Sequence, residues 1–240
     1  MRTGDDNDGQ APRGRHVAVA GASGLVGRAL VARLCADPGV ARVHALVRRP
    51  LAMEARGLQL HVVDFERLPD LPPLDEAYLA LGTTIGVAGS RAAFRAVDFD
   101  ASLAVARAAV AAGARRIGLV SATGADARSH LFYNRVKGEL ENALLALPID
   151  ALVIARPSLL LGDRAALGQP ARRVERLAAA ADRWLRPLVP ARVRAIAADD
   201  VAAALVAVVP HARGRQLLES ERMQGGRVAA PACAPSPPNH

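Results

Sequence analysis

The sequence predicts an α/β fold built on a doubly wound parallel sheet, with helices on both faces. Three observations support this fold class. Short apolar runs alternate with segments of helical spacing along most of the chain. A glycine-rich turn directly follows the first apolar run. Apolar residues make up 51% of the 240 residues but aromatic residues only 3%, as suits alanine-rich helices packed on valine and leucine strands.

The first two thirds of the chain predict six strands with helices between them. The apolar runs that end in glycine, an acidic residue or a loop indicate strands at residues 16–20, 43–47, 58–63, 77–81, 117–120 and 151–155. Helical spacing predicts a helix at 25–36 and another at 91–112, which Gly113 closes. Ser129 is a candidate cap for a third helix that runs to about residue 147, before Pro148.

The pattern changes after Pro157. A helical stretch is expected at about 170–185, a short strand at 195–197, and a last helix from a cap at Asp199 through residue 209. We therefore predict one α/β domain over 15–223, whose segment 158–198 closes over the carboxyl ends of the strands. Residues 1–14 and 224–240 have the polar or Gly/Pro-rich composition of disordered tails.

Composition argues against several other functions. The net charge is +8, but the arginines are scattered and do not alternate with aromatic residues, so we expect no nucleic-acid partner. Two cysteines and six isolated histidines predict neither a disulfide framework nor a metal site. Apolar runs such as 201–209 are too short to span a bilayer, and the acidic N-terminus does not resemble a signal peptide. We expect a cytoplasmic protein without a membrane partner, monomeric or homodimeric.

The turn after the first strand has the spacing of a phosphate-binding loop. Its glycines are spaced GxxGxxG, and a helix is expected to begin within it. In such a loop the first glycine permits the tight turn, the second lets the backbone approach a pyrophosphate, and the third lets the helix pack closely. The helix N-terminus adds unpaired N–H groups for the phosphates. We expect a Rossmann-type fold with a dinucleotide bound by Gly21, Ala22, Ser23, Gly24, Leu25, Val26 and Gly27.

The residues after the second strand predict which dinucleotide binds. Arg48 and Arg49 stand where an enzyme that uses NAD usually has an acidic residue for the ribose hydroxyls. A guanidinium suits the extra 2′-phosphate of NADP(H), so NADP(H) is expected in preference to NAD(H). Asp64, after the third strand, is a candidate contact to the adenine amino group.

Three further residues form a candidate catalytic set. Tyr133 and Lys137 are four residues apart on an expected helix and so share a face, and Ser121 ends the preceding strand. Lys137 is the one lysine among 31 basic residues. Free tyrosine has a pKa near ~10, and a neighbouring ammonium would stabilise its phenolate. The set predicts Tyr133 as acid/base, Lys137 as its modulator, and Ser121 as the group that positions a carbonyl.

Several segments together resemble the atypical or extended short-chain dehydrogenase/reductases, particularly the Tat-interacting-protein-like NADP(H)-binding oxidoreductases. The resemblance covers about residues 15–222 and is carried by GASGLVG at 21–27, LVRRP at 46–50, LGTT at 81–84, VSATGA at 120–125, FYNRVKGELE at 132–141 and ARPSLLLGDR at 155–164. It implies Ser121, Tyr133 and Lys137 as the catalytic triad. Cofactor contacts implied in addition come from Leu81, Gly82, Thr83, Lys137, Arg156, Pro157 and Ser158.

The resemblance has two departures. Extended members often carry Asn near position 98, where this chain has Asp98, and the substrate segment is short, with Pro187 and Pro190 breaking it. The leading hypothesis is an NADP(H)-dependent reductase of a small carbonyl or alcohol, with Leu159 to Leu161 partly lining a nonpolar pocket. An NADP(H)-binding regulatory or sensor protein is the alternative. Epimerase chemistry with tightly held NAD is a third hypothesis, which Arg48 and Arg49 disfavour.

Overall fold

A computed structural model describes residues 14–161 and 194–224. Seven parallel strands form its main sheet, in the order β3-β2-β1-β4-β5-β6-β9. The order reverses between β1 and β4, which creates the switch point where α/β proteins bind ligands. The strands are β1 (Arg15–Ala20), β2 (Val40–Val47), β3 (Leu58–Val62), β4 (Glu76–Leu79), β5 (Arg116–Val120), β6 (Ala151–Arg156) and β9 (Gly214–Glu219).

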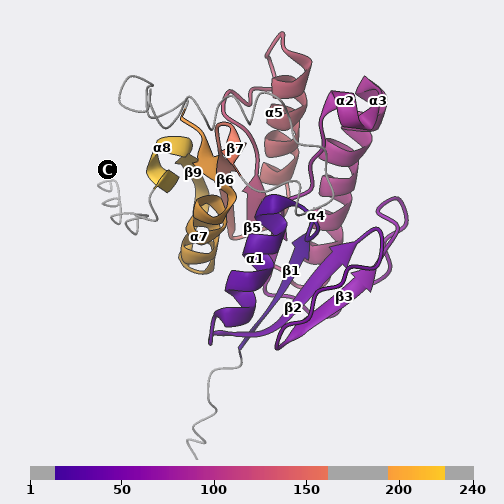
Figure 1. Cartoon of the computed structure of the whole chain (residues 1–240), viewed down its shortest axis with the longest axis vertical. Helices are drawn as coiled ribbons and strands as arrows, with labels where there is room; N and C mark the ends of the chain where they lie inside the picture. Colours follow the sequence, from indigo (N-terminus) through magenta and orange to yellow (C-terminus); the bar gives the residue numbers. More distant parts are fainter. Residues whose placement is uncertain (1–13, 162–193, 225–240) are drawn as a thin grey trace, which may run out of the picture.

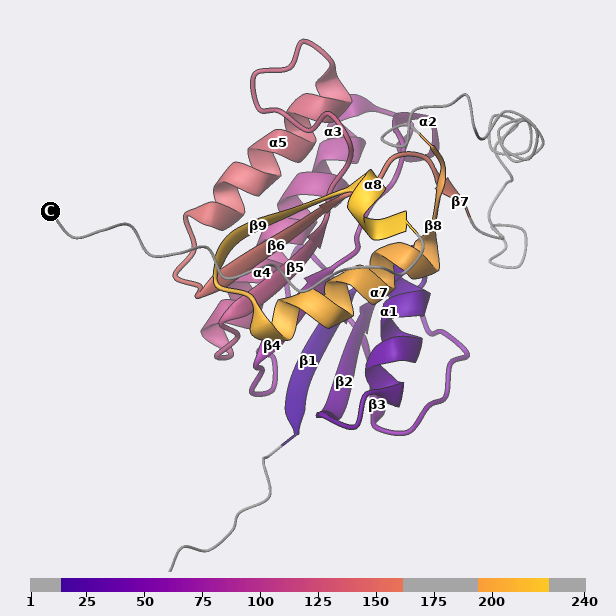
Figure 2. The same cartoon turned by 90° about the vertical axis from the view of Figure 1, so that its left-hand side faces the viewer.

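Helices cover both faces of the sheet (Figures 1 and 2). On one face lie α1 (Leu25–Ala36) and α7 (Ala198–Val208), which pack against each other. On the other lie α4 (Ser102–Ala111) and α5 (Phe132–Leu145). Shorter elements are α2 (Ile85–Ala88), α3 (Arg91–Arg95), the π-helical turn η1 (Ala96–Ala101), the 3-10 turn η4 (Val209–His211) and α8 (Ser220–Met223), and the pair β7 (Leu160–Leu161) and β8 (Ile196–Ala197).

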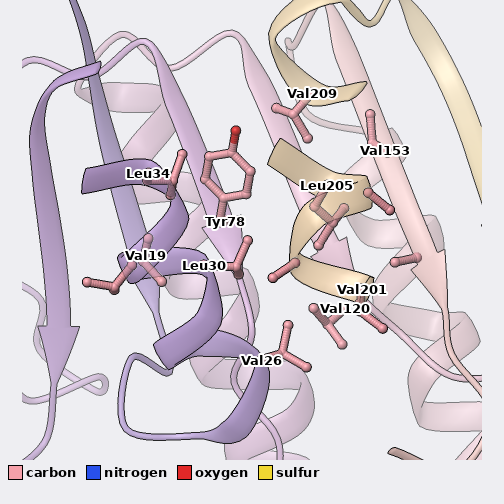
Figure 3. Packing of buried hydrophobic residues seen from close by; sticks show 14 of the residues in the cluster. Val19, Val26, Leu30, Leu34, Tyr78, Val120, Val153, Val201, Leu205 and Val209 are labelled. Carbon is pink, nitrogen blue, oxygen red and sulfur yellow. The ribbon is translucent and has the colours of Figure 1, made fainter. Parts of the chain in front are cut away.

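The core has two parts, one on each face. Leu30 and Leu34 of α1 and Leu205 of α7 meet the buried ring of Tyr78 and the valines of the sheet (Figure 3). On the opposite face, leucines and alanines of α4 and α5 cover the other side of the same strands. Because a strand's side chains alternate between faces, each central strand contributes to both parts, and its run of apolar residues is nearly continuous.

The predicted fold class is confirmed, with four local corrections. The strand β9 was not predicted, and its pairing with β6 extends the sheet at that edge. The helix expected at 91–112 is divided into α3, η1 and α4. Ser129 does not cap α5: its hydroxyl accepts a hydrogen bond from the N–H of Leu131, and the helix begins at Phe132. Asp199 lies inside the first turn of α7 instead of capping it.

Asp199 has a different role, because its carboxylate forms a bidentate ion pair with Arg33 of α1, at 2.9 and 2.6 Å. The Arg33 guanidinium lowers the pKa of this carboxyl group. The pair joins the two helices that cover one face of the sheet.

Some of the predictions fall on residues that the structure does not describe. These are the expected helix at about 170–185, the breaks at Pro187 and Pro190, and most of the two tails.

Candidate cofactor and catalytic site

Close backbone contacts require glycine in the loop between β1 and α1. Gly21 has φ +86°, and a Cβ there would lie 2.4 Å from the carbonyl oxygen of Ala80. A Cβ at Gly27 would lie 2.0 Å from the carbonyl oxygen of Gly21. Neither position therefore tolerates a side chain without movement of the backbone. Gly24 precedes α1, whose first residue is Leu25, so the loop leads directly into the helix N-terminus.

The other residues of the loop divide between core and surface. Ala22, and Val26 in the first turn of α1, are buried in the core, while Ser23 is exposed. The N–H of Gly24 donates to the carbonyl of Gly21 at 2.9 Å, which closes the turn. The combination of a tight turn, close helix packing and an open helix end suits a dinucleotide pyrophosphate.

The residues expected near the adenosine follow β2 and β3. Arg48 and Arg49 are both exposed and follow the last residue of β2. Asp64 is also exposed, and one of its carboxylate oxygens accepts a hydrogen bond from the N–H of Glu66 at 2.9 Å. Since β1, β2 and β3 are adjacent and parallel, their carboxyl ends lie at one edge of the sheet, as these assignments require.

The segment Leu81–Gly82–Thr83 after β4 lies next to Lys137. The N–H of Thr83 donates to a carboxylate oxygen of Asp98 at 2.9 Å. The other oxygen of Asp98 lies 2.7 Å from the Lys137 Nζ. A Cβ at Gly82 would lie 3.7 Å from Asp98 and 4.0 Å from that Nζ. The loop expected to line the cofactor is thus joined through Asp98 to the lysine of α5.

The Asp98–Lys137 ion pair is buried, with residue exposures of 1% and 4%. Burial by itself would lower the pKa of Lys137, but the carboxylate of Asp98, with smaller contributions from Tyr133 and Glu141, outweighs it and raises that pKa. Lys137 is therefore an ammonium held in one place. Asp98 belongs to η1, and single π-helical turns of this kind occur frequently at functional sites.

Tyr133 lies at the entrance of this site. It is 36% exposed and sits one helical turn before Lys137 on α5. Its ring packs on Phe94 of α3, with ring centroids 5.5 Å apart, and Phe94 also contacts Phe132. The contact with Phe94 packs the Tyr133 ring against α3, and Tyr133 remains exposed enough to contact a ligand.

The hydroxyl of Ser121 has a partner within the protein. Its hydroxyl donates to the carboxylate of Glu141 at 2.5 Å, and both residues are buried. Arg156 donates to the two oxygens of Glu141 at 3.0 and 2.6 Å. The Arg156 guanidinium has a raised pKa, chiefly because of its hydrogen bond to Glu141, and so stays charged. The structure thus links two predicted site residues, Ser121 and Arg156, through a carboxylate that was not predicted.

The residues after β6 are held by the protein itself. The carbonyl oxygens of Arg156 and the buried Pro157 accept hydrogen bonds from the hydroxyl and the N–H of Thr123, both at about 3 Å. The hydroxyl of Ser158 donates to the carbonyl of Arg194 and lies 3.0 Å from the hydroxyl of Ser220. The segment is therefore a rigid part of the wall beside Ser121.

Sequence reasoning did not single out Asp98 and Glu141 as partners of the predicted site residues. Asp98 was noted only as a departure at the position of an expected asparagine. Glu141 lies four residues after Lys137, so Tyr133, Lys137 and Glu141 follow one another on a single face of α5. That spacing was a usable signal for Glu141. For Asp98 the chain separation of 39 residues from Lys137 left no local pattern to read.

A Rossmann-type sheet with a glycine loop at its switch point defines a class of nucleotide-binding proteins. A protein family described as NAD(P)H-binding matches residues 21–155 of this chain. The chain belongs to that NAD(P)H-binding family. The match covers the glycine loop, Ser121, Tyr133 and Lys137.

Curated relatives place the chain more narrowly, in the group of FMP52 and HTATIP2. It is 35% identical over 176 residues to the FMP52 protein of Emericella nidulans, across 69% of this chain and 75% of the relative. It is 38% identical over 149 residues to that of Eremothecium gossypii, across 61% of this chain and 66% of the relative. Protein HTATIP2 of Rattus norvegicus is 36% identical over 157 residues, across 62% and 64% of the two chains. The aligned region thus spans slightly less than two thirds of two of these relatives.

Solved structures agree with the fold. MoeE5 in complex with UDP-glucose and NAD superposes with a TM-score of 0.64 at 19% identity, covering 85% of this chain and 76% of that chain. A short-chain dehydrogenase/reductase superfamily protein from Agrobacterium tumefaciens with bound NAD superposes with a TM-score of 0.61 at 16% identity, covering 85% and 77%. At this level of identity the likeness concerns the fold alone.

The prediction of a cytoplasmic protein is wrong by these comparisons, because the FMP52 relatives are named mitochondrial proteins.

Over the parts of the chain that the structure describes, no helix is both long enough and apolar enough to cross a membrane. In the same parts, no three His, Cys, Asp or Glu side chains form a group able to hold a metal ion.

Proposed function

We propose that the protein is an NADP(H)-dependent oxidoreductase that transfers hydride between the nicotinamide and a small carbonyl or alcohol. The observation that carries this proposal is the placement of an accessible phenol, Tyr133, one turn from a buried ammonium, Lys137, beside the loop of Gly82. Membership in an NAD(P)H-binding family supports the cofactor class. The exposed Arg48 and Arg49 support the choice of NADP(H), because guanidinium groups pair well with a phosphate.

The chain's own residues fit the dinucleotide. The loop of Gly21, Gly24 and Gly27 would hold the pyrophosphate, and Lys137 with the segment 81–83 would hold the nicotinamide ribose. When bound, the nicotinamide supplies or accepts the hydride. Tyr133 would give its phenolic proton to the carbonyl oxygen as the carbon is reduced, and would take a proton from the alcohol in the reverse direction.

Ser121 would position the substrate oxygen. Its hydroxyl proton points to Glu141, so a substrate hydroxyl can donate to its free lone pairs. To donate to a substrate carbonyl, the hydroxyl must rotate away from Glu141. That rotation leaves Glu141 bonded to Arg156, so no buried carboxylate loses all its partners.

Binding and turnover are tested separately. Purified protein is titrated with NADPH and with NADH by calorimetry, and is then screened with aliphatic and aromatic aldehydes and ketones. Tyr133→Phe is expected to keep the NADPH affinity and to lose turnover on any substrate found. If the protein binds neither NADPH nor NADH, the proposed function is wrong. If Tyr133→Phe retains the turnover of the parent protein, the mechanism assigned to Tyr133 is wrong.

A second function has specific support. The hydroxyl of Ser121 is bonded to Glu141 and the charge of Lys137 is balanced by Asp98, an arrangement that also suits a protein that binds NADP(H) as a regulatory or sensor module. This alternative predicts tight NADPH binding with no turnover across the same screen.

A further inference from the structure

We propose that the entrance of the candidate site binds the apolar part of the substrate, so that the preferred substrates are neutral aldehydes, ketones or alcohols with an extended hydrocarbon group. The inference rests on the proposed oxidoreductase function for the reaction at the carbonyl, while the binding surface is a feature of the protein alone. This surface consists of Ile85 and Val87 of α2 and of Leu131 and Tyr133 at the start of α5. We call these four side chains the apolar rim.

The apolar rim gathers most of the large hydrophobic side chains that are exposed in the described part of the chain. Six such residues are exposed, and four of them belong to the rim. The other two lie on other parts of the fold, Val62 on β3 and Leu145 at the opposite end of α5. Single exposed hydrophobic residues are normal on a protein surface, whereas a group of them marks a place where something binds.

Helix α2 is apolar although none of its residues is buried. The segment 81–90, which contains this helix, has no charged residue. The helix is held by its two ends: the hydroxyl of Thr84 accepts the N–H of Val87 at 3.2 Å, and Gly89 closes the last turn with φ +84°. Because these caps hold the helix without burial in the core, the side chains of Ile85 and Val87 remain available to a ligand.

The rim is continuous with the candidate catalytic residues. Tyr133 belongs to both, and its ring packs on Phe94 of α3, which in turn contacts α2. Helix α2 begins two residues after Thr83, whose N–H is bonded to Asp98, the partner of Lys137. Helices α2, α3 and α5 lie close together in both views of the molecule (Figures 1 and 2). A ligand whose carbonyl reaches the phenol therefore places its other atoms along the rim.

The arginines around the rim are directed to other groups. Arg91 and Arg135 both stack on the ring of Phe132, with Cζ atoms 5.3 and 5.8 Å from its centroid. Arg95 is paired with Glu139. The four rim side chains themselves carry no carboxylate, ammonium or guanidinium group. They can therefore stabilise a hydrocarbon group by removing it from water, but they cannot pair with a carboxylate or a phosphate.

Binding of 1-alkanols tests the proposal without turnover. Full-length protein is titrated calorimetrically with 1-butanol, 1-hexanol and 1-octanol, with and without NADP+. We expect the affinity to rise at least about twofold for each added methylene, or about 16-fold from 1-butanol to 1-octanol. An affinity that does not depend on chain length would overturn the proposal. Tighter binding of 8-hydroxyoctanoate than of 1-octanol would also overturn it, because an anionic group would then be recognised.

Two rim positions allow a direct test by substitution. Val87→Asn/Leu131→Asn removes apolar surface without adding a charge, and the fold should tolerate it because the two side chains are 71% and 66% exposed. We expect this double variant to bind 1-octanol about tenfold more weakly and NADPH within about twofold of the parent. Val62→Asn/Leu145→Asn is the matched control, since it changes the two exposed hydrophobic residues outside the rim and should bind 1-octanol like the parent. Equal weakening in both double variants would show that 1-octanol binds without preference for the rim, and the proposal would fail.

A second copy of the chain is the competing occupant of the rim, and sedimentation velocity distinguishes it. We expect the parent and Val87→Asn/Leu131→Asn to have the same oligomeric state. If the parent is a dimer, the double variant is a monomer and the parent does not bind 1-octanol, the rim is a subunit interface and the proposal is wrong.

The proposed function and the present inference fail in distinguishable ways. Binding that increases with chain length, without turnover of any aldehyde or alcohol, would remove the oxidoreductase function and leave the apolar rim as a binding site. Turnover with the same kcat/KM for butanal and octanal would keep the oxidoreductase function and overturn the inference about its substrates.

Discussion

The hydroxyl of Ser121 donates its proton to the carboxylate of Glu141, a residue of α5 twenty positions further along the chain, at 2.5 Å. The same carboxylate receives the guanidinium of Arg156 from β6. This buried junction joins β5, α5 and β6 directly beneath the candidate catalytic site, so its integrity affects both the fold and the orientation of Ser121.

Glu141→Gln should destabilise the protein by about 3 kcal/mol, because removing one partner of a buried ion pair leaves the other charge poorly compensated. Urea unfolding followed by circular dichroism measures the change. Glu139→Gln is the control on the same helix: its pair with Arg95 is partly exposed, so we expect a loss of less than about 1 kcal/mol. Equal losses in the two variants would contradict the importance of the junction.

Gly27→Ala should weaken NADPH binding about tenfold or more. Its Cβ would lie 2.0 Å from the carbonyl oxygen of Gly21, so helix α1 or the loop must move, and overpacking of this kind costs about 1–3 kcal/mol. Gly86→Ala is a suitable control, because no atom lies within 4 Å of a Cβ at that position. Calorimetric titration compares the two variants. Retained affinity in folded Gly27→Ala would show that this loop does not hold the cofactor.

Replacement of both Arg48 and Arg49 by alanine should weaken NADPH binding about 100-fold or more and leave NADH binding nearly unchanged, since each charge-assisted hydrogen bond to the 2′-phosphate contributes about 1.5–3 kcal/mol. Arg42→Ala and Arg56→Ala serve as controls for the loss of exposed positive charge elsewhere on the chain. Equal weakening of both dinucleotides would contradict the predicted specificity.

A histidine pair makes stability depend on pH. His44 is buried, and its Nδ1 lies 3.0 Å from the Nε2 of His61. Burial, followed by the neighbouring His61, His16 and Arg42, lowers the pKa of His44 to about 4. In the unfolded chain this side chain takes up a proton near pH ~6.5. The stabilisation is therefore fully present above pH 6.5 and is lost as the pH falls from about 6.5 to 4.

The expected loss from His44 is of the order of 1–3 kcal/mol over this range. His44→Gln does not titrate, so its free energy of unfolding should vary less with pH between 4 and 6.5 than that of the parent. His211→Gln, at an exposed position, should follow the parent curve. Parallel curves for the parent and His44→Gln would rule out His44 as the cause.

The sequence by itself determined the features that depend on neighbouring residues. The glycine spacing at 21–27 and the alternation of apolar runs predicted the tight glycine turn, helix α1 at its observed bounds, and the positions of the first six strands along the chain. Tyr133 and Lys137 were placed on one helix by their separation of four. These patterns are local because backbone sterics and helix periodicity act over a few residues.

Only the tertiary structure decided which partners the site residues have. Asp98 meets Lys137 across 39 residues of chain, Glu141 joins Ser121 to Arg156, and β9 finds its place through pairing with β6. The segment Gly214–Glu219 has an exposed arginine, Arg215, at its start and no long apolar run, so its strand character depends on the edge that β6 offers. Contacts of this kind follow from burial and charge pairing between distant elements, which bring together side chains that no short sequence pattern connects.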